Sequence, residues 1–222
     1  MTTAVTGLWR PSAFAAWALH AGTFQALACV ALAMVFSTLG AYRLQGAVRV
    51  EDLVFGPSRS TIVDTLLALI GVERTAVLVY VLQRSFDALV VAAALTPIFL
   101  WLLGSSAMHA AAAIRGVRGR TYLPLLVLFA YAELVYQVPT SVAGIAFAGG
   151  ALAPVTDVVS VVMLAWFGLV VFRGIERHYG VSGRPALAIF LLGGLVFYLL
   201  PLILIAATLV AIVVAAAVLQ YF

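Results

Sequence analysis

The stretch from Pro185 to Phe222 reads PALAIFLLGGLVFYLLPLILIAATLVAIVVAAAVLQYF and contains no charged residue. About 20 mostly apolar residues are enough for a helix to cross the hydrocarbon core of a bilayer. At a rise of 1.5 Å per residue, roughly 35 helical residues reach about 50 Å, which is too long for one straight span and too short for two spans with a turn. Gly193, Gly194 and Pro201 stand where a kink would fall. We therefore favour one long helix, bent or protruding, over a broken pair.

Four other apolar stretches have the length of a span, and the whole chain has a membrane composition. Of its 222 residues, 65% are hydrophobic and 9% are charged, whereas soluble domains carry about 25% charged residues. The first stretch is longer than the ~7–15-residue core of a signal peptide, so we interpret it as a retained helix. The sequence thus predicts an all-α, polytopic membrane protein with a single membrane domain over residues 1–222. Its expected spans are residues 13–41, 88–114, 122–147, 155–172 and 185–219.

The residue types exclude several kinds of chemistry. All twelve basic residues are arginine, so neither a lysine Schiff base nor a Walker A phosphate loop is possible. Cys29 is the only cysteine, which excludes an intramolecular disulfide, a multi-cysteine zinc site and a cysteine-ligated iron–sulfur cluster. We expect Cys29 to pack in the core. Because GxSxG, HExxH and GxGxxG motifs are also missing, we expect neither an enzyme nor a bound cofactor.

Residues 45–87 form the one sizeable region that we expect outside the bilayer. Thr61 and Asp64 have the spacing of a capping box, and Gly71 can end the helix that they begin. Because the apolar residues between them share one face, we predict a short amphipathic helix lying in the membrane interface. A second amphipathic stretch, residues 73–86, is expected to run directly into the second span.

Arginine counts predict the orientation of the chain. Cytoplasmic loops of membrane proteins are enriched in basic residues, and one side of the expected topology collects more arginines than the other. The N-terminus should therefore be cytoplasmic. These basic loops can attract lipid headgroups, whereas we expect no nucleic-acid partner. Arg10 precedes the first span, and the loops on the same side contain Arg115, Arg118, Arg120, Arg173, Arg177 and Arg184, with Glu176 as their only acidic residue.

A polar stripe follows one face of the third expected span. Glu133 lies near the middle of that span, and Gln137, Thr140 and Ser141 follow at helical spacing. An ionised carboxylate at this depth costs about 2.5–3.5 kcal/mol on insertion scales, so Glu133 should be protonated, paired, or facing water or a partner. The stripe should face other helices, where it either joins them by hydrogen bonds or forms part of a proton or ion relay.

Two histidines make a second, weaker constellation. His20 and His109 lie at similar depths, near the cytoplasmic ends of their expected spans. Two histidines on neighbouring helices can ligate a b-type haem or help to bind a metal. Isolated histidines more often cap helices or form hydrogen bonds in the core, and we favour that interpretation.

The second to fifth spans together resemble the Yip1-domain family of polytopic membrane proteins. The resemblance covers about half of the chain and consists of patterns of glycine, proline and aromatic residues. Its main parts are Leu95-Thr96-Pro97 followed by Trp101 and Ser105-Ser106, the link 115–122 with Leu123-Pro124 and Pro139 behind it, Trp166 with the segment 174–186, and the lead-in Arg10-Pro11.

The resemblance implies five helices with a cytoplasmic N-terminus. Eukaryotic relatives carry a hydrophilic N-terminal region and act in vesicle trafficking through small GTPases. Here about a dozen residues precede the first expected span. The segment from Asp52 to Pro57 departs from the acidic motif of those relatives by one extra residue, and it follows the first span. The resemblance therefore implies a prokaryotic-type member in the cytoplasmic (inner) membrane, and we infer no binding of small GTPases.

Three functional hypotheses follow from the sequence. The first is a non-catalytic accessory or scaffold subunit that packs with itself or with another integral membrane protein. The second is a small transporter or permease component with Glu133 as an intramembrane protonatable group. The third is a haem-binding membrane subunit with two histidine ligands.

Overall fold

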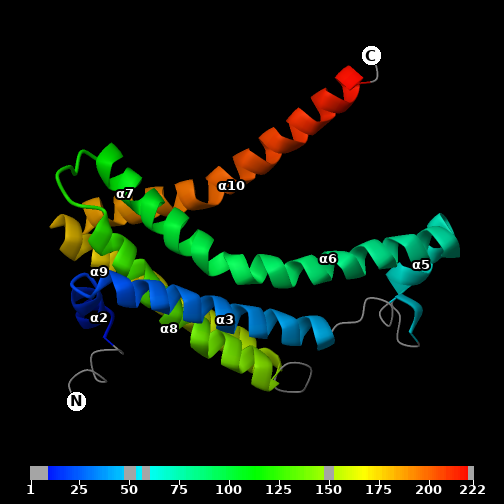
Figure 1. The fold of residues 1–222 in the computed structure, drawn as a ribbon, viewed down its shortest axis with the longest axis horizontal. Coiled ribbons are helices and arrows are strands. Elements are labelled where there is room, and N and C mark those ends of the chain that lie inside the picture. The colour runs from blue at the N-terminus through cyan, green and yellow to red at the C-terminus, as the bar shows by residue number, and fades with distance from the viewer. Residues whose placement is uncertain (1–9, 48–53, 57–60, 148–152, 220–222) are drawn as a thin grey trace. The chain divides into compact units, whose positions relative to one another are not determined.

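The computed structural model describes residues 10–47, 54–56, 61–147 and 153–219, and the regular elements in these ranges are all helical. Half of the segment from Asp52 to Pro57 lies outside them. Within these ranges five helices are long and apolar enough to cross a membrane, so the predicted all-α membrane architecture is confirmed at that level. In chain order the elements are α2 (Pro11–Ala18), α3 (Thr23–Ala47), α5 (Thr61–Ile70), α6 (Val72–Phe99), the π-helical turn η1 (Leu100–Gly104), α7 (Ser105–Ile114), α8 (Leu123–Phe147), α9 (Ala153–Tyr179) and α10 (Arg184–Leu219) (Figure 1).

The chain forms two compact units, which are described separately. Unit 1 comprises Met1–Ala26, Phe99–Ala132 and Gly168–Phe222. Unit 2 comprises Leu27–Ile98 and Glu133–Phe167. Because the unit boundaries fall inside α3, α8 and α9, each of these helices contributes one part to each unit.

The first expected span is two helices rather than one. We predicted a continuous helix over residues 13–41, but α2 ends at Ala18 and α3 begins at Thr23. The turn between them is tightened by backbone bonds from His20 to Trp17 and from Ala21 to Ala18. His20 Nδ1 also lies 2.8 Å from the Ala16 carbonyl oxygen, where it competes for an acceptor of the helix. The candidate span is therefore Thr23–Arg43.

α6 follows α5 and extends well into the expected second span, residues 88–114. Gly71 has φ +83°, which ends α5 as predicted, and α6 then continues without a break from the amphipathic stretch into the apolar one. Inside α6, Pro97 has no N–H to offer the carbonyl oxygen of Ala93 one turn earlier. Ser37 of α3 supplies the missing donor, because its hydroxyl donates to Ala93 O at 2.7 Å. This bond joins α3 to α6 within unit 2.

One boundary in the last part of the chain differs from expectation. We predicted that the fourth span ends at residue 172 and that a polar link follows, but α9 continues to Tyr179. Arginine favours helix, and the ion pair of Arg173 with Glu176 at i and i+3 supports the extra turns. The true link is residues 180–183. α10 is one continuous helix from Arg184 to Leu219, as favoured over a broken pair (Figure 1).

The core of unit 1 surrounds the first half of α8. Leu125, Leu128 and Phe129 are at most 2% exposed, and Ile175 of α9 and Ile189 of α10 are fully buried as well. Because lipid removes the hydrophobic drive between helices, close packing has to hold them together. Glycines make that approach possible in this unit: Gly104 faces the Phe129 ring, Gly174 faces Leu128, and Gly193 faces Met108.

Candidate functional site

The carboxyl group of Glu133 is buried in unit 2. The side chain is 1% exposed, and neither carboxyl oxygen has a hydrogen-bond partner among the described residues. A buried polar group without a partner costs about 1–3 kcal/mol, and a buried charge costs more. Glu133 therefore differs from the other polar groups of the spans described below, which do have partners.

The rest of the predicted stripe is used within the helix and against α3. Gln137 Nε2 donates to Ser141 Oγ at 2.9 Å, one turn further along α8. The Thr140 hydroxyl donates to the carbonyl oxygens of Tyr136 and Gln137 at 2.9 and 3.0 Å. Ser141 Oγ lies 3.4 Å from the point where a Cβ of Gly40 would stand, so α3 and α8 approach closely there. The stripe thus faces a neighbouring helix at its outer end.

A second group of polar side chains joins α7, α8 and α9 in unit 1. The hydroxyl of Tyr122 lies 2.7 Å from Ser105 Oγ and 3.0 Å from Ser106 Oγ. The hydroxyl of Tyr179 lies 2.8 Å from His109 Nδ1. The His109 ring also packs edge-on against Tyr122, with ring centroids 5.4 Å apart. These hydrogen bonds connect helices to one another, which is a structural use of polar groups in a bilayer.

The two links at this end of unit 1 lie against each other. His178 Nε2 donates to the Thr121 carbonyl oxygen at 2.9 Å. Arg120 Nη2 lies 3.7 Å from the point where a Cβ of Gly180 would stand. The α7–α8 link and the end of α9 therefore form one continuous surface.

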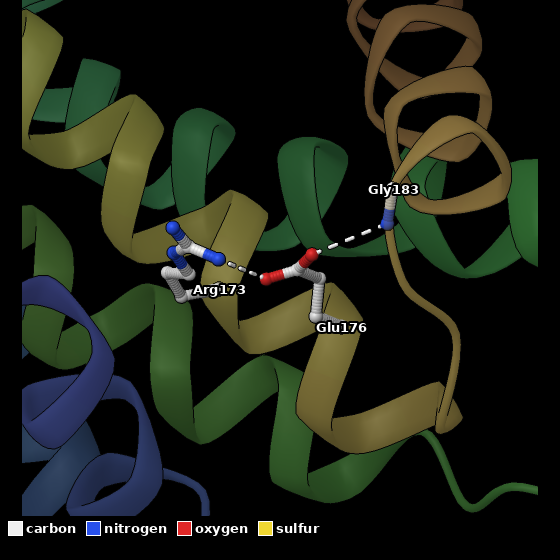
Figure 2. Close-up of polar contacts among 3 residues, drawn as sticks. All are labelled: Arg173, Glu176 and Gly183. Carbon is white, nitrogen blue, oxygen red and sulfur yellow. Dashed lines mark hydrogen bonds and ion pairs between the residues drawn. The ribbon is translucent and has the colours of Figure 1, made fainter.

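Glu176 neutralises one arginine and closes the α9–α10 turn. Its Oε2 accepts a hydrogen bond from Arg173 Nη1 at 2.6 Å, and its Oε1 accepts one from the Gly183 amide at 3.4 Å (Figure 2). Gly180 and Gly183 have φ values of +67° and +63°, which side-chain-bearing residues rarely adopt. One carboxylate thus orients the start of α10.

The six arginines predicted in the basic loops are all exposed and belong to unit 1. Of these, only Arg173 forms an ion pair among the described residues. The other five are Arg115, Arg118, Arg120, Arg177 and Arg184.

The two histidines of the haem hypothesis have separate partners. His20 is exposed and bonds from the α2–α3 turn back to Ala16 of α2, whereas His109 bonds to Tyr179. No hydrogen bond or ring contact joins His20 to His109 in the described part of the chain. No cluster of three or more metal-ligating side chains occurs in those residues either. The haem hypothesis stays a prediction.

Sequence reasoning missed several residues that hold the helices together. Trp101 Nε1 donates to the Leu126 carbonyl oxygen at 2.8 Å, and Tyr131 donates to Gln25 Oε1 at 3.1 Å. Aromatic residues with a polar atom inside an apolar span are the signal that could have drawn attention to them, because that atom needs a partner there. Their distant partners have no local sequence signal.

We compared the chain with family models, with curated proteins and with solved structures, and none of them matches it.

Proposed function

We propose that the protein is a non-catalytic integral membrane accessory or scaffold subunit, which packs with itself or with another membrane protein. The observation that supports this proposal most directly is that the chain buries some of its apolar helices much more than others. In the most apolar window of α8, 44% of the residues are buried within the chain, against 6% for the long helix through α6 and α7 and 11% for α9. α8 is therefore the helix that the rest of the chain covers, and α6 and α9 keep apolar faces available.

The use of the polar side chains supports the same proposal. Apart from Glu133, the polar groups described above bond to other helices, to links or to their own backbone. Ser37 completes the ladder around Pro97, and Tyr122 and Tyr179 join α7 to its neighbours. A subunit that contributes surface and rigidity needs this arrangement, whereas a catalytic centre would need reactive groups that converge on a substrate.

The topology and family expectations belong to this proposal. The arginines at one end of unit 1 are exposed, which favours a cytoplasmic location for that end and for the N-terminus. The proposed membrane is a prokaryotic inner membrane. α5 is proposed to lie in the membrane interface, where lipid would cover Leu69, which is 80% exposed. Membership of the Yip1-domain family is proposed on the sequence patterns alone.

Cysteine crosslinking combined with native mass spectrometry tests the subunit proposal. Because Cys29 is the only cysteine, a Cys29→Ser background accepts single cysteines on the exposed face of α9, at Val158 and Val161, which are 62% and 66% exposed. We expect crosslinks at one or both positions and an assembly heavier than one chain after mild extraction from the native membrane. Cysteines at the buried Val170 and Val171 serve as controls that should not crosslink. A monomer without crosslinks at either α9 position, nor at Val77 or Val91 on the exposed face of α6, would contradict the proposal.

The isolation of Glu133 favours a second candidate function, a transporter component in which this carboxyl group binds and releases a proton. A carboxylate this deep is costly unless it is protonated or meets a partner. Gln137 and Ser141 continue the polar face from Glu133 towards the end of α8. In this role Glu133 would take up its proton along that face.

A hydrophobic carbodiimide tests this second function, because it reacts with protonated carboxyl groups in apolar surroundings. We expect the reagent to modify Glu133, and the Glu133→Gln variant to lose both the modification and proton flux in proteoliposomes. The exposed Asp157 provides a matched control, since Asp157→Asn should change neither. Flux that is unaffected by Glu133→Gln would exclude the transport role.

A further inference from the structure

The arginine surface of unit 1 carries positive charge that the chain itself does not neutralise. It comprises the α7–α8 link and the end of α9 with the α9–α10 turn, and its arginines are Arg115, Arg118, Arg120, Arg173, Arg177 and Arg184. Glu176 is its only acidic residue and is already paired with Arg173 at 2.6 Å (Figure 2). Five guanidinium groups therefore remain without an ion pair among the described residues.

Hydrogen bonds hold the parts of this surface together. The bond from His178 to Thr121 joins the end of α9 to the α7–α8 link at 2.9 Å, and Arg120 lies over the turn at Gly180. The Tyr179–His109 bond fixes the end of α9 to α7. The α7–α8 link contributes one group of arginines, and the end of α9 with the start of α10 contributes another, so two anionic groups a short distance apart can be held at the same time.

The position of the surface points to a ligand that belongs to the membrane. The arginines stand where α7 and α9 end and where α8 and α10 begin, which is the level of lipid phosphates if these helices span the bilayer. Guanidinium groups bind phosphate oxygens in bidentate geometry, and the amino ends of two long helices add positive potential. Free anions and nucleic acids would also be attracted by the positive charge, but the position of the arginines at the level of the lipid phosphates favours a lipid.

Exposed apolar side chains continue directly from the arginines along the helices. Ile114 precedes Arg115 and is 69% exposed, and Leu123 at the start of α8 is 50% exposed. Leu187 and Leu191 lie one and two turns beyond Arg184 and are 46% and 60% exposed. A ligand that fits both parts has phosphate at one end and acyl chains at the other.

We propose that the arginine surface of unit 1 is a binding site for an anionic phospholipid with two phosphate groups, of the cardiolipin type. One phosphate binds the arginines of the α7–α8 link, and the other binds Arg177 and Arg184. The acyl chains lie along α7, α8 and α10. Basic surfaces between transmembrane helices commonly recognise such headgroups. A lipid with one phosphate would bind only one of these two groups of arginines.

Native mass spectrometry with defined lipids tests the site. Detergent-solubilised protein is titrated with cardiolipin, phosphatidylglycerol and phosphatidylcholine that carry the same acyl chains. We expect cardiolipin to bind about tenfold more tightly than phosphatidylglycerol, because its second phosphate makes charge-assisted contacts that one phosphate cannot make, and we expect phosphatidylcholine to bind most weakly. Equal retention of the three lipids would overturn the proposal.

Variants locate the site. Arg120→Gln and Arg184→Gln should each weaken cardiolipin binding about tenfold, towards the affinity for phosphatidylglycerol. Arg120→Lys should fall between, because it keeps the charge but loses the bidentate fork. Arg43→Gln removes an exposed arginine at the end of α3, outside the surface, and should bind cardiolipin as the wild type does. All of these positions are exposed, and circular dichroism checks that each variant keeps its helices.

Two further outcomes would overturn the proposal. If Arg43→Gln weakened binding as much as Arg120→Gln, the attraction would be general charge rather than a site. If millimolar inorganic phosphate displaced cardiolipin, the surface would be a site for free phosphate. The measurement requires neither a partner subunit nor proton transport, so its result is independent of both proposed functions.

Discussion

The bond between Ser37 and Ala93 allows a sharp test of how the two helices are held together. Pro97 leaves the Ala93 carbonyl oxygen without its intrahelical donor, and the Ser37 hydroxyl replaces it at 2.7 Å. Ser37→Ala removes only that hydroxyl, from a side chain that is 8% exposed. The substitution leaves an acceptor without a partner, so we expect it to lower the free energy of unfolding by about 1–2 kcal/mol.

The reasoning makes a stronger claim about the second substitution. Pro97→Ala restores an N–H at position 97, so the Ala93 carbonyl oxygen regains its donor within the helix. In that background Ser37→Ala should cost at most about 0.5 kcal/mol, which gives a coupling energy of about 1 kcal/mol in a double-mutant cycle. Thr38→Val is the matched control, because the Thr38 hydroxyl bonds to Met34 O in its own helix, and it should change stability by less than about 0.5 kcal/mol.

The assay is unfolding in mixed micelles titrated with sodium dodecyl sulfate, followed by circular dichroism. If Ser37→Ala costs the same in the wild-type chain and in the Pro97→Ala variant, the hydroxyl does not compensate for the proline. A cost for Thr38→Val as large as that for Ser37→Ala would also show that the helix is sensitive to any lost hydroxyl.

Three other predictions concern unit 1 and are checked by thermal unfolding in detergent. Gly104→Ala should destabilise the protein by about 1–3 kcal/mol, because the new Cβ would stand 2.8 Å from Cε1 of the buried Phe129. Gly144→Ala in α8 is the control and should be neutral or stabilising, because nothing lies within 4 Å of its Cβ position. Equal effects of the two substitutions would show that the close approach at Gly104 is unimportant. Tyr122→Phe should cost about 1 kcal/mol through the lost bonds to two serine hydroxyls, and an unchanged melting temperature would count against that network. Gly180→Ala should lower the stability by about 1–2 kcal/mol, because φ at this position is +67°. An unchanged melting temperature would contradict this prediction.

The sequence predicted most reliably what depends on local composition. The apolar run of the third span gave α8 to within about a residue at its start, and Gly71 was recognised as the end of α5. The break after Ala18 was missed because a short apolar segment with one histidine and one glycine looks the same in a helix as in a turn. The extension of α9 was missed because charged residues were interpreted as a loop, although Arg173 and Glu176 stabilise another turn.

The polar sites divide along the same line. Glu133 and the arginines of the basic loops were identified because charge in an apolar chain is visible without a structure. Ser37 and Ala93 are separated by 56 residues, and His109 and Tyr179 by 70. Pairs at such distances in the chain are chosen by helix packing, for which a single sequence contains no direct signal.

The π-helical turn from Leu100 to Gly104 makes the length of the chain itself a structural variable. A π turn accommodates one residue more than an α-helical turn, and one residue corresponds to a rotation of about 100° around the helix. Trp101 bonds to Leu126 at the start of the turn, and His109 bonds to Tyr179 beyond its end. Because the π turn absorbs the additional residue, deleting Leu102 or Leu103 would let the helix become a regular α-helix with both bonds still directed at their partners. A one-residue deletion here should therefore be less damaging than the same deletion in a regular part of α6 or α7, where everything beyond it would rotate by about 100°.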